Sequence, residues 1–345
     1  MSLNEPQIVD IAHSEGYIGL MFERIFGRRR AGTPPQLLRP ARINQAALLE
    51  LRVGVMVFDP LIEAEGGRRL SSLMGWHDPE VLAGQYIEDL AACSGGLARY
   101  TIAEWQVVDA YPRKIDGFRY DDASFMSCWQ RRAGFHQPDT ADYDAILREF
   151  NFVGKINSGV IDEVWLFGFP YAGFYESRMI GPDSFWCNAP PAAGPAACAQ
   201  RVVVMGFNFE RDVGCMLENF GHRVESIMSH VYRSQRGERN LWERFTRYDR
   251  SHPGRAECGN VHFAPSSASD YDWGNRRVVL SRADSWYGFP DLSGPLRPTG
   301  PAEWGGGDMR AHHLWWLDHL PRVSGSSDAV SNNWWGYVLQ PQTVR

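Results

Sequence analysis

The sequence lacks two features that would place it in or across a membrane. It has no apolar run near the roughly 18 residues that a membrane-spanning helix needs. Its first residues, MSLNEPQIVDIAHSEG, lack the basic start and the apolar core of a secretory leader. We therefore expect no membrane partner and a cytoplasmic location, although a secreted chain whose leader has been removed would have the same sequence.

An excess of positive charge is also missing. The 345 residues include 35 Lys and Arg against 41 Asp and Glu, which gives a net charge of −6 at pH 7. Basic residues concentrate at Arg28-Arg29-Arg30, with Arg39 and Arg42 following, and such a patch can attract an anion. In an acidic chain it is more often a solvated surface, so we expect no nucleic-acid partner.

The six cysteines include no C-x-x-C pair, which argues against a zinc ribbon. A chain of this length buries a core without disulfides, so free buried thiols are the simplest interpretation. Aromatic residues are abundant, with 13 Trp, 13 Tyr and 18 Phe. Large rings fill cores, and they also line clefts that bind sugars or aromatic and cationic ligands.

Hydrophobic patterning predicts an α/β fold with a mostly parallel central sheet flanked by helices. The predicted strands are 53–58, 100–108, 164–167 and 202–206, and the predicted helices include 14–26, 43–51, 79–92, 142–156, 213–231 and 309–320. We divide the chain into a lead-in (1–50), an α/β core (51–232) and an irregular region rich in Trp, Gly and Pro (233–345). This last region should cap the carboxyl-end face of the sheet, so that one composite domain results.

Polar side chains follow several of the predicted strands, where ligands of open α/β sheets bind. Asp59 follows strand 53–58, although an Asp before Pro is nearly as common in a plain turn. Tyr171 and Glu176 follow strand 164–167 across a Gly-rich turn. Glu210 and Arg211 lie between strand 202–206 and the long helix. We take all five as candidate catalytic residues.

The helix 213–231 has two opposite faces. Its apolar residues fall on one stripe, whereas Glu218, His222, Ser226 and Ser229 lie opposite, with Glu225 at the border. An ordinary amphipathic helix with a solvated polar face explains this pattern. Against that stands Gly221, which costs about 1 kcal/mol relative to Ala in a helix interior. Gly221 could instead cap one helix and leave His222 on a turn.

His222 and Glu225 are three residues apart, close enough to share one ion. Catalytic zinc commonly takes three protein ligands and leaves one position for water. A third ligand could come from His312, His313 or His319, the densest histidine group, and we select His313. Over these ligands alone, the spacing H-x-x-E with a distant His is similar to that of zinc carboxypeptidases and related deacylases.

Such a site predicts a metal-dependent hydrolase acting on an amide, ester or similar bond of a small-molecule or peptide substrate, with Zn²⁺ as cofactor. Glu210 or Glu176 would be the general base, and Arg211 or Arg178 would hold a substrate carboxylate.

Two alternatives stay open. Cys215 or Cys258 could be the nucleophile of a metal-free Cys/His hydrolase, although neither lies on a tight Gly-x-Cys-x-Gly turn. The chain could also be a non-catalytic protein that binds a glycan or a peptide in an aromatic cleft. A binding protein should lack titratable groups that converge in its main pocket.

Overall fold

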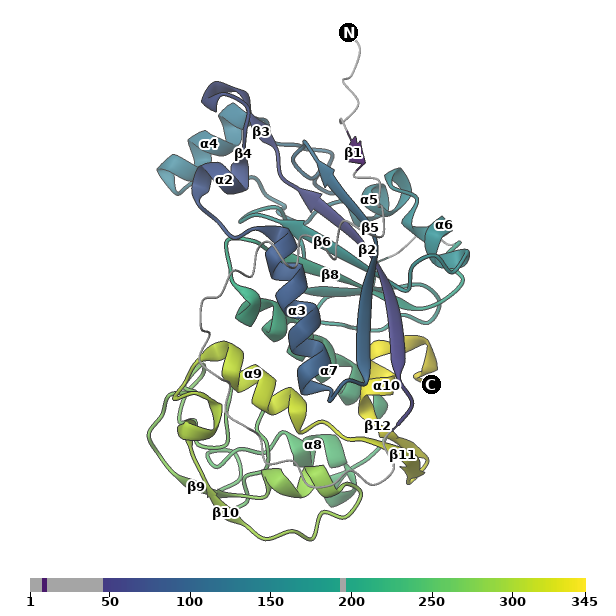
Figure 1. Cartoon of the computed structure of the whole chain (residues 1–345), viewed down its shortest axis with the longest axis vertical. Helices are drawn as coiled ribbons and strands as arrows, with labels where there is room; N and C mark the ends of the chain where they lie inside the picture. The colour runs from purple at the N-terminus through teal and green to yellow at the C-terminus, as the bar shows by residue number, and fades with distance from the viewer. Residues whose placement is uncertain (1–7, 11–45, 193–196) are drawn as a thin grey trace, which may run out of the picture.

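A computed structural model describes residues 8–10, 46–192 and 197–345 (Figure 1). The predicted helix 14–26 and the basic patch at 28–30 lie outside these residues. No helix in the described ranges is both long and apolar enough to span a membrane.

A six-stranded sheet forms the centre of the molecule, in the order β1-β5-β2-β6-β8-β7. Strands β5, β2, β6 and β8 are parallel, and β1 and β7 pair antiparallel at the two edges. The strands are β1 (Ile8–Asp10), β2 (Leu49–Phe58), β5 (Ala98–Val108), β6 (Glu163–Gly168), β7 (Ser177–Ile180) and β8 (Val202–Asn208). The α/β prediction is confirmed. The predicted helix 43–51 is wrong at its end, because residues 49–51 already pair with β5.

Shorter pairs of strands lie outside this sheet. They are β3 (Leu61–Ile62) with β4 (Arg68–Arg69), β9 (Val279–Ser281) with β10 (Arg297–Thr299), and β11 (Arg322–Ser327) with β12 (Val330–Asn333).

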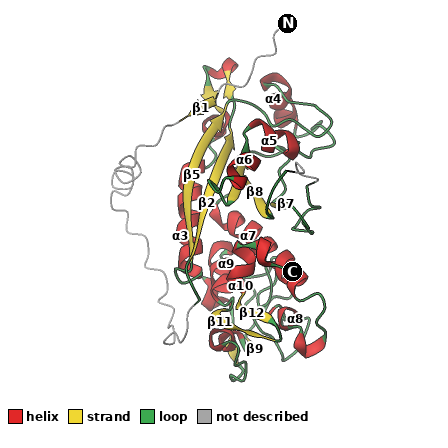
Figure 2. Cartoon of the chain, turned by 90° about the vertical axis from the view of Figure 1, so that its right-hand side faces the viewer, coloured by secondary structure: helices red, strands yellow, loops and turns green. Residues whose placement is uncertain are grey.

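Helices cover both faces of the central sheet (Figure 2). The α-helices are α2 (Leu70–Met74), α3 (Pro79–Cys93), α4 (Asp122–Arg131), α5 (Tyr143–Glu149), α6 (Phe152–Asn157), α7 (Val213–Val231), α8 (Leu241–Phe245), α9 (Met309–Asp318) and α10 (Trp334–Leu339). Tyr86 of α3 packs edge-on against Trp165 and Phe207 of the sheet and against Phe220 of α7. Helices α3 and α7 therefore share one face. The opposite face is covered by α5 and α6, where Phe150 packs on Phe58.

Residues 233–345 pack against the helix layer through α9, which contacts both α3 and α7 (Figure 1). Five buried rings form the centre of this region: Trp242, Phe245, Trp286, Trp316 and Trp334. One hydrophobic core runs from β2 to Val344. Most of the aromatic residues that the sequence shows in excess thus fill this core.

A buried ion pair joins α7 to the sheet. Arg223 Nη1 lies 2.8 Å from Glu163 Oε2, and both side chains are almost fully buried. The same guanidinium donates to Val338 O of α10, and Trp165 Nε1 donates to Glu163 Oε1. Since each charge is paired and hydrogen-bonded, removal of either partner would leave the other charge uncompensated inside the protein.

We expect Arg223→Met to lower the free energy of unfolding by about 3–5 kcal/mol, because Glu163 then stays buried without its partner. The double variant Arg223→Met with Glu163→Gln removes the stranded charge and should recover more than half of that loss. Urea unfolding followed by circular dichroism measures both. A single variant that costs less than about 1 kcal/mol would show that the pair does not hold α7 in place.

His312 on α9 is buried among aromatic rings. Its ring stacks on Trp273 at 5.3 Å between centroids and 24° between planes. Within the described ranges neither ring nitrogen has a hydrogen-bond partner. Burial, and after it the neighbouring His313, holds the pKa of His312 well below its usual value of 6.5. The folded protein therefore keeps this ring neutral.

This burial predicts a loss of stability in acid. Below the unfolded pKa of 6.5 the unfolded chain binds a proton at His312 that the folded chain does not bind. As the pH falls below 6.5, each such group lowers the free energy of unfolding by about 1.4 kcal/mol per pH unit until the folded pKa is reached. Between pH 6 and pH 5, His312→Leu should thus lose about 1 kcal/mol less stability than the natural protein. Parallel slopes for the two proteins would contradict this assignment.

Candidate functional site

The site begins where β8 runs into α7, because a glycine in β8 admits a neighbouring segment. A Cβ atom at Gly206 would collide with the carbonyl oxygen of Tyr175. Gly206 N also donates to Glu176 O at 3.1 Å, and Asn219 of α7 donates to Gly206 O. The close approach that only glycine allows therefore fixes the backbone of Glu176 beside the first turns of α7.

A second glycine brings the loop 258–263 against α7. The helix is continuous through Gly221, which confirms the predicted helix 213–231 and excludes the alternative of a cap at this residue. A Cβ atom at position 221 would lie only 2.6 Å from Val261 Cγ2. Gly221 is thus present for close packing rather than for capping, and the packing places His262 next to His222.

Three side chains with metal-binding atoms converge at this point. His222 Nε2 and His262 Nε2 lie 3.2 Å apart, and His262 Nε2 is 3.4 Å from Glu218 Oε1. One ligand-type atom from each of the three residues lies within 4.8 Å of the other two. Glu218 and His222 share one face of α7, whereas His262 comes from a loop 40 residues further along the chain.

A carboxylate holds the other nitrogen of each imidazole. Glu225 Oε2 lies 3.0 Å from His222 Nδ1, and Asp270 Oδ1 lies 3.0 Å from His262 Nδ1. A hydrogen bond to a carboxylate requires the proton on Nδ1, which leaves each neutral ring with a bare Nε2. Two bare nitrogens facing each other at 3.2 Å repel unless a proton or a cation lies between them. Carboxylates that orient histidines in this way are typical of the second layer of zinc sites.

Glu225 contributes in a further way. Its Oε1 accepts a hydrogen bond from Val261 N at 3.2 Å, so the same carboxylate fixes both His222 and the loop that carries His262. The structure thus places Glu225 behind His222, on the side away from His262 Nε2.

Glu176 stands at the edge of the group. Its Oε2 is 3.9 Å from His222 Nε2, and Asn188 Nδ2 donates to the same oxygen. Burial raises the pKa of Glu176, and the neighbouring His222 opposes that shift. A carboxylate in this place can accept a proton from a molecule held between itself and the histidines.

The pKa directions within the group show that its carboxylates and imidazoles favour each other's charged forms. Burial would raise the pKa of Glu218, but hydrogen bonds from His262 and Tyr271 outweigh it and hold the pKa below its usual value. The bond to Glu218 raises the pKa of His262. Burial acts to lower the pKa of His222, yet Glu225 outweighs it and raises that pKa. Surroundings that favour a proton on both imidazoles also favour a bound cation.

Two cavities border this group, one lined by His222 and the other by Glu218. The carboxyl-end cavity, of about 440 Å³, lies over the ends of β6 and β8, and its lining includes Tyr171, Glu176, Asn208, Arg211, Glu218 and Tyr271. The helix cavity, of about 490 Å³, lies along α7, and its lining includes Trp186, Asn188, His222, Glu225, His230 and Arg233.

The predicted catalytic residues separate into two sets. Tyr171, Glu176 and Arg211 line the carboxyl-end cavity. Asp59 does not, because its carboxylate accepts hydrogen bonds from Ser71 N and Oγ at 2.9 and 2.6 Å and holds the start of α2. Glu210 lines neither of the two cavities.

The two arginines that the sequence suggests for substrate binding, Arg178 and Arg211, have different surroundings. Arg178 donates to Pro190 O and Pro191 O, so its guanidinium serves the fold. The Arg211 side chain is 65% exposed, and its nearest carboxylate, that of Glu210, is 3.9 Å away. Arg211 is thus the cation that a ligand in the carboxyl-end cavity would meet.

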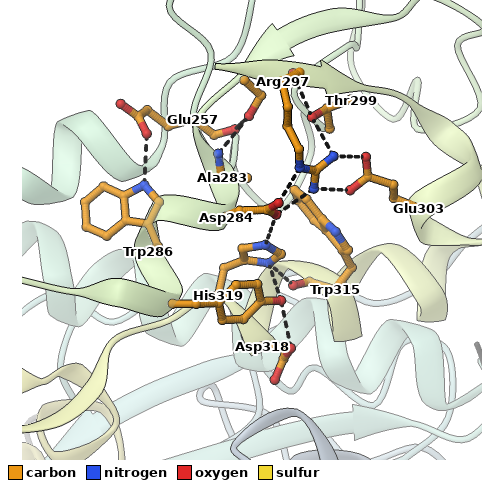
Figure 3. A network of polar contacts seen from close by, with 12 residues as sticks. Glu257, Ala283, Asp284, Trp286, Arg297, Thr299, Glu303, Trp315, Asp318 and His319 are labelled. Atoms are coloured by element: carbon orange, nitrogen blue, oxygen red, sulfur yellow. Dashed lines mark hydrogen bonds and ion pairs between the residues drawn. The ribbon is translucent and has the colours of Figure 1, made fainter. Parts of the chain in front are cut away.

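The histidines of α9 lie outside the converging group. His313 Nε2 is 3.3 Å from Val261 O, so this ring supports the loop that carries His262. Burial lowers the pKa of His313 to about 4. His319 belongs to another network, in which its Nδ1 is bonded to Trp315 O at 2.7 Å (Figure 3). The same nitrogen is 3.4 Å from the hydroxyl of Tyr287. In that network Arg297 bridges Asp284 and Glu303.

Neither cysteine of the metal-free alternative is placed as an activated nucleophile. Cys258 is fully buried, and burial raises its pKa well above the ordinary value. Cys215 lines the carboxyl-end cavity, but burial raises its pKa to about 11, which keeps the thiol protonated.

Sequence reasoning missed Glu218 and His262. The helical pattern predicts a solvated face for Glu218, yet the residue is only 9% exposed and is hydrogen-bonded by His262 and Tyr271. A signal for His262 was present in its surroundings, the loop Cys258-Gly-Asn-Val-His262 with Asp270 downstream. Nothing in the linear order indicated that this loop packs on Gly221.

Comparisons with protein-family models, with curated proteins and with solved structures find no match to this chain, so its function is argued from the site alone.

Proposed function

We propose that this protein is a metal-dependent hydrolase whose single ion, Zn²⁺ by its ligand chemistry, is bound by Glu218, His222 and His262. One observation carries the proposal. Two ligand atoms about 2.0–2.1 Å from a tetrahedral ion lie roughly 3.3 Å apart. The contacts of His262 Nε2 with His222 Nε2 and with Glu218 Oε1 measure 3.2 and 3.4 Å. Two histidines with one carboxylate are also a ligand set of catalytic zinc.

An ion held there would polarise an acyl oxygen and lower the pKa of a bound water towards neutrality. The residues around it supply the other functions. Glu176, beside His222 and open to the carboxyl-end cavity, is placed to take a proton from the attacking water and to return it to the leaving group. Arg211 is placed to hold a carboxylate or carbonyl oxygen of the substrate.

Convergence of titratable groups supports an enzyme over a protein that only binds. Glu176 lines the carboxyl-end cavity beside Glu218, and burial raises the pKa of Glu176. A carboxylate with a raised pKa in a cleft is typical of sites that move protons. The cytoplasmic location that we propose fits the six cysteines, which are all free.

The first test is metal content. Protein purified without added ions should carry close to one equivalent of a divalent transition metal per chain, measured by elemental analysis. His222→Ala and His262→Ala should each reduce it to a small fraction, because two ligands rarely retain zinc. The matched control is His77→Ala, which removes an exposed histidine on the loop before α3. Metal-free natural protein that also fails to bind added zinc would refute the site.

Glu225→Gln separates a ligand from a positioning residue. If Glu225 only orients His222, the variant should bind zinc about 10–100-fold more weakly and still reach full occupancy at high zinc. Asp270→Asn should behave alike, since it holds His262 in the same manner. Competition with a chromogenic chelator measures both affinities. Complete loss of binding in Glu225→Gln alone would instead make Glu225 a ligand.

Glu176→Gln tests the chemistry apart from the metal. We expect normal zinc content but hydrolysis slowed by about 10²–10⁴-fold, the usual contribution of a general base. The assay follows acetate release from acetylated esters and amides, with a chelator-treated sample as the baseline. Unchanged hydrolysis in this variant would remove Glu176 from the mechanism and leave the metal site untouched.

A further inference from the structure

The exposed aromatic rings of this protein gather at the proposed metal site. Within the described ranges, three Trp, Tyr or Phe residues are exposed, namely Trp186 at 60%, Tyr271 at 48% and Tyr171 at 40%. Trp186 lines the helix cavity, whereas Tyr171 and Tyr271 line the carboxyl-end cavity. Solvent-exposed rings on both sides of one group of metal-binding atoms indicate a surface that binds a small molecule or a chain.

Each of the two cavities is lined in part by residues of the site or residues next to it. His222 and Glu225 line the helix cavity, and Glu176 and Glu218 line the carboxyl-end cavity. Asn188 lines the first and hydrogen-bonds Glu176 of the second. A ligand with parts in both cavities would therefore cross the converging histidines at its middle. This geometry suits a chain that continues on both sides of the reacting group.

The ring of Tyr171 is held rigidly. Phe135 stacks on one of its faces at 3.4 Å between centroids and 12° between planes. The Tyr171 backbone has a φ of +66°, in the left-handed region, and the buried Lys114 Nζ donates to its carbonyl oxygen at 2.6 Å. A ring fixed in this way loses little conformational entropy when a ligand stacks on it. In the other cavity, Phe185 beside Trp186 stacks on His230 at 3.8 Å.

The backbone next to the site does not favour an extended peptide. A peptide commonly adds as a strand to a free sheet edge. The edge strand that follows Glu176 is β7, and residues 190–192 already cover it. Ala192 N donates to Met179 O at 3.0 Å, and Arg178 Nε donates to Pro190 O at 3.0 Å. With strand addition at β7 disfavoured, the exposed features beside the site are ring faces, which match the C–H faces of pyranose sugars, and polar groups, which match their hydroxyls.

We infer that the substrate is an acylated saccharide chain, whose sugar rings stack on Trp186 and Tyr171 while its acyl group lies at the metal site. The inference rests on the proposed function for its reaction. The oxygen of water bonds to the acyl carbon, and the acyl C–N or C–O bond breaks. One proton of that water passes through Glu176 to the leaving nitrogen or oxygen, and the other is taken up by the released amine or, for an ester, is released to solvent. The products are a carboxylate and an amino or hydroxyl group on a chain that stays intact.

Binding to chelator-treated full-length protein tests the inference without any turnover. One probe is a β-1,4-linked N-acetylglucosamine tetrasaccharide, whose acetyl groups are amides. The other is an O-acetylated xylotetraose, whose acetyl groups are esters. Calorimetry should show binding of at least one probe. Trp186→Ala and Tyr171→Ala should each weaken it by about tenfold. Val278→Ala removes an exposed apolar side chain outside both cavities and is the control, which should bind like the natural protein.

The outcomes separate this inference from the proposed function. If neither probe binds, or if both alanine variants bind as the natural protein does, the inference of a saccharide substrate is wrong. If a probe binds but the zinc-loaded protein releases no acetate from it, the saccharide ligand is supported and the proposed hydrolase activity is wrong. If the protein hydrolyses acetylated peptides but binds neither saccharide, the hydrolase activity is supported and the inference of a saccharide substrate is wrong.

Discussion

The buried pair of Arg223 and Glu163 sets the rotation of α7, and the rest of the site depends on that rotation. Arg223 points into the sheet, where it meets Glu163 at 2.8 Å and the carbonyl of Val338. The adjacent His222 must then point outwards, and Glu218 and Glu225, four and three residues away, share its face. A turn of the helix by one residue would leave a buried charge without its partner and would also move these three side chains away from His262.

Close backbone packing then brings the remaining residues to α7. Gly206 admits the segment that carries Glu176, and Gly221 admits Val261 and with it His262. Neither glycine has a positive φ, so close approach rather than backbone freedom accounts for both. A methyl group at either position would displace a functional side chain. The stability of the fold and the geometry of the site therefore depend on the same contacts.

The aromatic residues have two separate roles. The rings around Trp316 and Trp334 are buried and bind residues 233–345 to the helix layer. Trp186, Tyr171 and Tyr271 stay in water beside the converging histidines and carboxylates. The excess of Trp and Tyr is thus mainly a property of the core, and a small number of exposed rings shape the surface where a ligand would bind.

The sequence by itself determined the parallel α/β sheet, because continuous apolar strands such as 202–206 and the 3.6-residue stripe of 213–231 are local patterns. It also pointed to His222 and Glu225, three residues apart on one helix, and to Tyr171, Glu176 and Arg211 at strand ends. Only the tertiary structure decided that Glu225 stands behind His222, that Glu218 is buried and hydrogen-bonded by Tyr271, and that His262 rather than His313 faces His222. The physical reason is distance along the chain. Helical spacing determines neighbours within about two turns, whereas the contact of His262 with His222 depends on how a loop 40 residues away packs against Gly221.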